Sequence, residues 1–102
     1  MLSVWPFGSN DFDVRGKVVV ITGAGQGIGL AAAKILYGRG ARIAILDVDA
    51  SSAAQAAESL GRNALAIPVD VRDRPAMAAA IEKVTGHFGR LDVVVANAGV
   101  VP

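Results

Sequence analysis

The chain has 102 residues, enough for one domain, and 53% of them are hydrophobic, which excludes an intrinsically disordered protein. Its formal net charge is only +1 and its basic residues are scattered, so nucleic acids and anionic membranes are poor candidates as partners. It contains no cysteine and a single histidine, His87, which excludes a disulfide framework and a metal site built from these two residue types.

The first sixteen residues differ from the rest of the chain. They include Asp11 and Asp13 and lack the basic region and the continuous apolar core of a signal peptide. No apolar run anywhere in the chain reaches the roughly 18 residues that are needed to span a membrane. We therefore interpret residues 1–16 as a leader that packs loosely on the domain, and we expect a cytoplasmic protein.

Four short apolar segments and three helical segments alternate over residues 17–102. The apolar segments are nearly continuous, which is typical of parallel strands that are buried on both faces. Asp49 and Asp73 are expected to cap the second and third helices, and Pro68 confines the third strand to a sheet edge or a ladder end, because proline has no N–H to donate. The strands are expected at about 17–22, 42–47, 64–69 and 91–96, and the helices at about 28–38, 50–60 and 74–88.

This βαβαβαβ order predicts an α/β protein whose parallel strands are joined by right-handed crossovers. The segment T-G-A-G-Q-G-I-G, from Thr22 to Gly29, lies between the first strand and the first helix. Glycines in such a turn let the backbone adopt positive φ and let a phosphate approach closely, while the N-terminus of the helix favours negative charge. The segment therefore predicts a nucleotide or dinucleotide site, although a glycine turn that binds nothing remains an alternative.

The spacing of the glycines narrows the choice among families of nucleotide-binding proteins. The pattern G-x-G-x-x-G fails when it is read from Gly23, because Ile28 occupies its last position, and no P-loop motif occurs in the chain. The pattern T-G-x-x-x-G-x-G is met by Thr22, Gly23, Gly27 and Gly29. This spacing resembles that of the short-chain dehydrogenase/reductase family, and the resemblance implies a partial Rossmann-type doubly wound sheet with the strand order 3-2-1-4. It covers residues 17–102, which correspond to the amino-terminal, NAD-binding half of such an enzyme.

An acidic residue follows the second strand. Asp47 comes twenty residues after Gly27, where a dinucleotide fold presents a carboxylate to the adenosine ribose. Such a carboxylate accepts hydrogen bonds from the ribose hydroxyls and repels a 2′-phosphate, so we expect NAD to be preferred over NADP, and Gln26 supports this choice weakly. Asp47 as an ordinary turn residue is the alternative. Ile28 in the loop and Val48 after Asp47 complete this part of the expected cofactor site.

The ends of the third and fourth strands supply the remaining site residues. In the family, a pair such as Asp70 and Val71 touches adenine, whereas local sequence alone would make Asp70 a helix-entry residue. The segment Asn97, Ala98 and Gly99 resembles the N-N-A-G segment that closes the fourth strand over the adenosine side of the pocket. Here Ala96 replaces the first asparagine of that pattern, which puts one hydrogen bond in doubt.

The family's catalytic residues are absent from this chain. The resemblance implies hydride transfer between NAD and an alcohol or carbonyl substrate, with a tyrosine, a lysine four residues later and a serine as the catalytic groups. The only tyrosine is Tyr37, and position 41 is alanine, so we predict no catalytic residue and no metal site in this chain and no turnover by it alone. His87 is interpreted as a structural residue near the end of the third helix.

Two functions therefore remain: the amino-terminal portion of a short-chain oxidoreductase, or a free-standing NAD-binding module without catalysis. The coding sequence beyond the Pro102 codon distinguishes them, because a continuing frame with Y-x-x-x-K favours the enzyme. We expect the longer enzyme to be a homo-oligomer. In the strand order 3-2-1-4 the fourth strand is an edge without gatekeeping charges, so the 102-residue chain is expected to associate through residues 91–96.

Overall fold

The computed structural model describes residues 2–6 and 13–97 of the chain. Residues 98–102 lie outside this range, so Ala98 and Gly99 of the expected cofactor site lie outside the described residues. The elements in chain order are β1 (Leu2–Pro6), β2 (Val18–Thr22), α1 (Gly27–Gly38), β3 (Arg42–Asp47), α2 (Ala50–Leu60), β4 (Ala64–Pro68), α3 (Arg74–Phe88) and β5 (Val93–Asn97).

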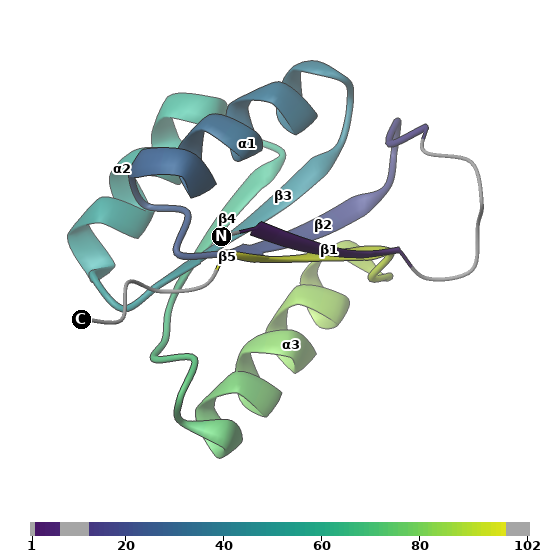
Figure 1. Cartoon of the computed structure of the whole chain (residues 1–102). Helices are drawn as coiled ribbons and strands as arrows, with labels where there is room; N and C mark the ends of the chain where they lie inside the picture. The colour runs from purple at the N-terminus through teal and green to yellow at the C-terminus, as the bar shows by residue number, and fades with distance from the viewer. Residues whose placement is uncertain (1, 7–12, 98–102) are drawn as a thin grey trace.

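The strands form one sheet in the order β1-β5-β2-β3-β4 (Figure 1). Strands β2, β3, β4 and β5 are parallel, and their order β4-β3-β2-β5 confirms the 3-2-1-4 order predicted from the sequence. Pro68 is the last residue of β4, which forms one edge of the sheet, as its missing N–H requires. Residues Asp49 and Asp73 cap α2 and α3 as predicted.

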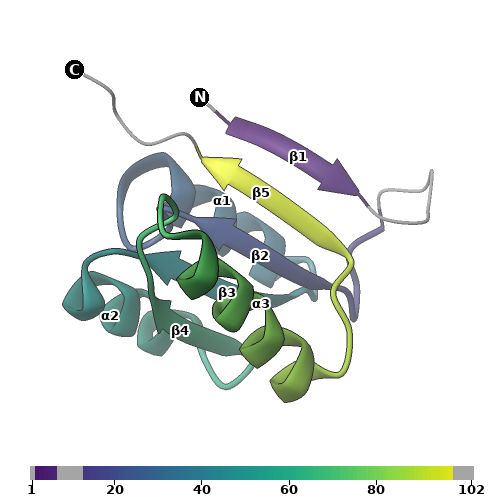
Figure 2. The same cartoon turned by 90° about the horizontal axis from the view of Figure 1, so that it is seen from below.

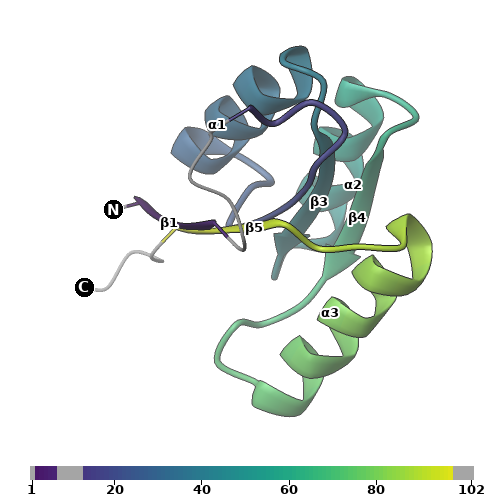
Figure 3. The same ribbon diagram turned by 90° about the vertical axis from the view of Figure 1, so that its right-hand side faces the viewer.

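Helices cover both faces of the sheet. Helices α1 and α2 lie on one side and α3 on the other (Figure 3). Alternate strand residues face the two sides, so Val19 and Ile21 pack toward α1 and α2, whereas Val18 and Val20 pack toward α3. Because β2 is buried on both faces, its first four residues, Val18–Ile21, are continuously apolar, and only its last residue, Thr22, is polar.

Within the leader, residues 2–6 form a strand and do not pack loosely, so the prediction is wrong for this segment. Leu2–Pro6 pair antiparallel with β5, in a register that runs from Leu2 opposite Asn97 to Pro6 opposite Val93 (Figure 2). Val14 is buried in the core cluster beneath α1 and α2. The edge of the fourth predicted strand, β5, is therefore covered rather than open, because an apolar edge strand pairs readily with any compatible extended segment.

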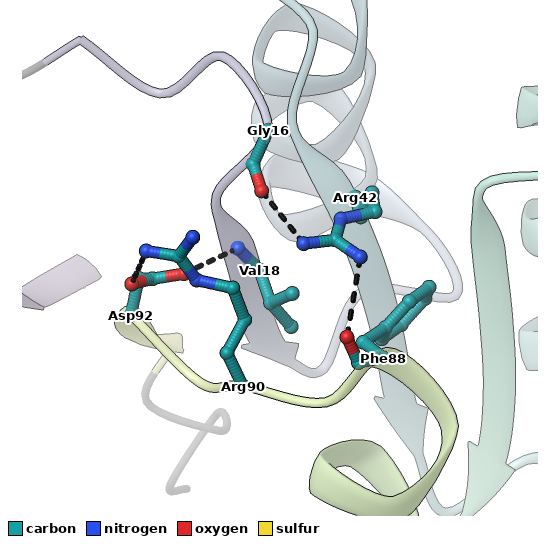
Figure 4. A network of polar contacts seen from close by, with 6 residues as sticks. All are labelled: Gly16, Val18, Arg42, Phe88, Arg90 and Asp92. Carbon is teal, nitrogen blue, oxygen red and sulfur yellow. Dashed lines mark hydrogen bonds and ion pairs between the residues drawn. The ribbon is translucent and has the colours of Figure 1, made fainter.

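Polar contacts join the elements at the amino ends of the strands (Figure 4). The guanidinium of Arg42 donates to the carbonyl oxygens of Gly16 at 2.8 Å and of Phe88 at 3.2 Å. Asp92 accepts hydrogen bonds from the Val18 N–H at 2.9 Å and from Arg90 at 2.6 Å. These contacts tie the end of α3 and the start of β5 to the starts of β2 and β3.

Within the described part of the chain, no helix is both long and apolar enough to cross a membrane.

Candidate functional site

The glycine loop connects the carboxyl end of β2 to the start of α1, beside the carboxyl ends of β3 and β5. The Gly23 N–H donates to the carbonyl oxygen of Leu46 in β3 at 2.7 Å. Asn97 in β5 donates its backbone N–H to Thr22 Oγ1 at 3.1 Å and its Nδ2 to the Gly23 carbonyl oxygen at 3.3 Å. Asn97 therefore fixes the position of the loop relative to the end of β5.

The four loop glycines meet different requirements. Gly23 and Gly27 have φ values of +64° and +65°, a conformation that favours glycine. A Cβ on Gly29 would collide with the Gly23 carbonyl oxygen, and a Cβ on Gly25 would lie 2.8 Å from both Asp47 Oδ2 and Ser52 Cβ. In contrast, apart from the adjacent residues and the nearby backbone of α1 itself, no atom lies within 4 Å of a Cβ built on Gly27, so the space in front of Gly27 is open.

The N-terminus of α1 has no side-chain cap. Its N-cap residue, Gln26, makes no capping hydrogen bond, and the first turn contains no acidic residue. The other two described helices differ: Asp49 accepts from the Ser52 N–H and Asp73 accepts from the Ala76 N–H, each at 3.1 Å. The first N–H groups of α1 and its positive dipole end are therefore available to an anion, directly beside the open space at Gly27.

Asp47 is held beside this loop by two backbone N–H groups. Its Oδ2 accepts from the Gly25 N–H at 2.9 Å, and its Oδ1 accepts from the Asp49 N–H at 3.0 Å. Each carboxylate oxygen can accept a second hydrogen bond, so the carboxylate is oriented but not saturated. This arrangement depends on Gly25, which was not among the predicted site residues, because the close approach between Gly25 and Asp47 is a tertiary contact.

Exposed apolar side chains lie near the carboxyl ends of the parallel strands, where the glycine loop also lies. Ile28 in the first turn of α1, Val48 after β3 and Val71 after β4 are 66%, 72% and 50% exposed. They account for three of the four large hydrophobic residues that are exposed in the described part of the chain; the fourth is Ile35. Large apolar side chains that remain exposed beside polar groups can contact the flat or aliphatic parts of a ligand.

Asp70 pairs with Arg72, a partner that was not predicted from the sequence. Its Oδ1 accepts from the backbone N–H and Nε of Arg72, at 2.9 and 3.1 Å, and its Oδ2 accepts from Nη2 at 2.9 Å. The hydrogen bonds from the Arg72 side chain and backbone lower the pKa of Asp70, so this carboxylate stays charged. Asp70 is not the helix-entry cap, because Asp73 has that role. An adenine amine at Asp70 would share the carboxylate with Arg72.

Two residues whose side chains could take part in acid–base chemistry, Tyr37 and His87, lie away from the glycine loop. Tyr37 is ten residues beyond Gly27 in α1, which corresponds to about 15 Å along the helix, and its hydroxyl lies against Gly61 at the end of α2. His87 lies in the last turn of α3, as predicted, and its ring meets the edge of Phe88 at 4.6 Å between centroids. Neither residue is part of the cluster around the glycine loop.

Comparison with known proteins identifies relatives for this arrangement. Residues 17–102 match the family described as short chain dehydrogenase. The chain is 44% identical to cis-4-hydroxycyclohexanecarboxylate dehydrogenase of Sinomonas cyclohexanicum, over 82% of this chain and 34% of that protein. It is 41% identical to human 15-hydroxyprostaglandin dehydrogenase [NAD(+)], over 85% of this chain and 35% of that protein.

A solved structure agrees with these relatives. The structure of 3-ketoacyl-(acyl-carrier-protein) reductase from Brucella melitensis, complexed with NADH, superposes with a TM-score of 0.75 at 37% identity, covering 76% of this chain and 32% of that one. The chain therefore spans about a third of the length of the relatives that it matches.

Proposed function

Because this chain belongs to the short chain dehydrogenase family, we propose that its glycine loop binds NAD and that the chain is the cofactor-binding portion of an oxidoreductase. The longer protein would transfer hydride between NAD and an alcohol or carbonyl substrate. The observation that carries the proposal is the uncapped N-terminus of α1, which faces the open space at Gly27 beside the carboxylate of Asp47.

The residues around the loop suit the parts of a dinucleotide. The pyrophosphate would lie against the N–H groups at the start of α1, next to Gly27, and Gln26 would border it. The ribose hydroxyls would donate to the free lone pairs of Asp47. The adenine ring would lie near Asp70 and Val71, with further apolar and backbone contacts from Gly23, Ile28, Gly29, Val48, Asn97, Ala98 and Gly99.

NAD, when bound, supplies or accepts the hydride. The residues of this chain bind and orient it, and the charge of Asp47 would disfavour the extra phosphate of NADP through repulsion of like charges. The only tyrosine in the sequence, Tyr37, lies about 15 Å along α1 from the loop. We therefore propose that the acid–base groups come from outside residues 1–102. The cytoplasmic location and the homo-oligomeric longer form stay predictions.

A second candidate function is a free-standing NAD-binding module. The observation that favours it is the pairing of β1 with β5, which covers the outer side of β5 within the described part of the chain. Turnover of simple alcohols or ketones, measured by nicotinamide absorbance, would distinguish the oxidoreductase from the NAD-binding module only if it were assayed in a longer protein that contains this chain. For the 102-residue chain, both predict NAD binding without turnover.

The Asp47→Ala variant tests the proposed site. We expect weaker NAD binding by about 1.5–3 kcal/mol for each charge-assisted hydrogen bond lost, which is roughly tenfold to a hundredfold in affinity. The difference in binding affinity between NAD and NADP should become smaller, as measured by calorimetric titration with both cofactors. Asp49→Asn is the matched control, because it removes a charge two residues away and keeps a good helix cap. An unchanged NAD preference in Asp47→Ala would show that this carboxylate does not select the cofactor.

A further inference from the structure

A cleft lies between α3 and β4, the strand that forms one edge of the described sheet. Its volume is about 300 Å³, which is at the lower end of the range for small-molecule sites. The residues that line it come from the strand and from the second half of the helix: Leu65, Ala66, Ile67, Pro68, Lys83 and His87. The cleft therefore has room for a small molecule and presents both apolar and cationic groups to it.

The floor of the cleft is apolar. Leu65 and Ile67 direct their side chains to the face of the sheet that α3 covers, where they pack in one cluster with Val84. Leu65 is only partly buried, so some of its apolar surface remains in contact with water. An aliphatic group laid on this surface would remove apolar area of the ligand and of the protein from water, which favours binding.

The wall of the cleft is cationic. Lys83 and His87 lie four residues apart in α3, so they project from the same side of the helix. Both residues are exposed, and among the described residues no carboxylate forms an ion pair with either of them or lines the cleft. The ammonium group of Lys83 supplies positive charge, and an imidazole ring has at least one N–H to donate. This wall suits a carboxylate.

The outer side of β4 is unsuited to an added peptide strand. Directly after β4, the Val69 N–H donates to a carbonyl oxygen of β3 at 2.9 Å. Successive residues of a strand direct their backbone groups to opposite sides, so Ala64, Ala66 and Pro68 face outward. The Ala64 N–H already donates within the turn before β4, and proline has no N–H, which leaves Ala66 as the only outward donor of β4. One donor can serve a small ligand but cannot sustain a ladder.

We propose that this cleft binds a short aliphatic monocarboxylate, with its carboxylate at Lys83 and its carbon chain on Leu65 and Ile67. The carboxyl end of α3 carries partial negative charge close to His87, which works against an anion. The carboxylate therefore belongs nearer to Lys83, one turn further into the helix. For a ligand of so few atoms, we expect a Kd in the millimolar range.

The cleft is separate from the glycine loop. Helix α3 ends at the amino ends of the strands, where the Phe88 carbonyl oxygen accepts a hydrogen bond from Arg42 at the start of β3. The glycine loop lies at the opposite, carboxyl ends, and none of the described residues proposed to bind NAD lines the cleft. Binding in the cleft therefore does not require that the chain binds NAD.

Titration of the 102-residue chain with hexanoate, followed by two-dimensional amide NMR, tests this proposal. The backbone amide signals of Ala66, Lys83 and His87 should shift and reach saturation at millimolar concentrations. Hexanamide has the same carbon chain without the charge, and acetate has the charge without most of the chain, so each should bind at least about tenfold more weakly. Hexanamide or acetate binding as tightly as hexanoate would overturn the proposal, as would shifts centred on the glycine loop.

A substitution at Lys83 tests the role of its charge. Lys83→Gln keeps a side chain of similar shape and should weaken hexanoate binding roughly tenfold. Lys34→Gln is the matched control, because Lys34 is an exposed lysine within α1 that does not line the cleft, and it should leave hexanoate binding unchanged. Equal hexanoate affinity in the two variants, or shifts that grow linearly without saturation, would refute the site. If Lys83→Gln does not fold, the comparison of hexanoate with hexanamide in the unmodified chain decides.

Discussion

Alanine substitutions at two loop glycines separate ligand binding from folding. Gly27 has a φ of +65°, and a Cβ there meets no atom within 4 Å, so Gly27→Ala introduces backbone strain without a collision. A non-glycine residue in the left-handed region costs about 1–2 kcal/mol, and we expect a loss of this size in the free energy of unfolding. The methyl group would also enter the space proposed for the pyrophosphate, so NAD binding should be lost almost entirely.

The Gly29→Ala variant should behave in the opposite way. Its methyl group would collide with the Gly23 carbonyl oxygen, and Gly23 cannot move freely because its N–H is bonded to Leu46 and its carbonyl to Asn97. Overpacking a rigid site costs about 1–3 kcal/mol, a large part of the roughly 5 kcal/mol that stabilises a marginally stable domain. A loss of NAD binding by Gly29→Ala should therefore be accompanied by a fall of this size in the free energy of unfolding.

Gly86 provides the control for both variants. It lies inside α3, has no positive φ, and a Cβ there meets nothing within 4 Å. Gly86→Ala should raise the free energy of unfolding by about 0.5–1 kcal/mol and leave NAD binding unchanged. Urea unfolding without ligand and calorimetric titration with NAD measure the two quantities. Wild-type NAD affinity in Gly27→Ala, or wild-type stability in Gly29→Ala, would refute this assignment of the two glycines.

The remaining predictions concern carboxylates that pair with an arginine two residues away. Asp92→Ala should lower the free energy of unfolding by about 2–3 kcal/mol, because this side chain is only 13% exposed and accepts two hydrogen bonds, whereas Asp13→Ala, at 46% exposure, should change it little in the same urea titration. Burial raises the pKa of Asp92, but the hydrogen bonds to this carboxylate outweigh burial, so the pKa of Asp92 is lowered in the folded protein. The stabilisation by Asp92 is therefore present above the unfolded-state pKa of about 3.8 and is lost as the pH falls from there through the lower pKa of the folded state. The free energies of unfolding of the unmodified chain and of Asp92→Ala should converge in acid. Arg72→Ala should raise the pKa of Asp70 toward its ordinary value in an NMR titration, and an unchanged pKa would show that Arg72 does not hold this carboxylate.

The sequence predicted the strands and helices of residues 17–97 well because their signals are local. The span 42–47 coincides with β3, since an apolar run lies between a glycine turn and Asp47. Asp49 and Asp73 each precede an alanine-rich segment and cap it as expected. The positions of the loop and of Asp47 followed from the order of strand, turn and helix, which places both at the carboxyl edge of a parallel sheet.

What the sequence did not predict depends on contacts between distant residues. The pairing of β1 with β5 joins residues about ninety positions apart, and a five-residue segment such as L-S-V-W-P has no periodicity that distinguishes a strand from a loosely packed leader. Gly25 was missed because its requirement comes from the approach of Asp47 and Ser52. The ion pair between Arg72 and Asp70 had a possible signal, because acid and arginine two residues apart occur three times in the chain.

The two ends of the sheet use their polar groups differently, and this difference predicts how substitutions at each end will act. At the amino ends of the strands, Arg42 and Asp92 are engaged with backbone groups of neighbouring elements, so their removal should reduce stability and leave ligand affinity intact. At the carboxyl ends, the N-terminus of α1 lacks a cap and Val48 remains exposed, although both features are unfavourable for an isolated domain. Substitutions there should mainly alter binding, except at Gly29, where the ligand site and the packing of the loop depend on the same backbone contact.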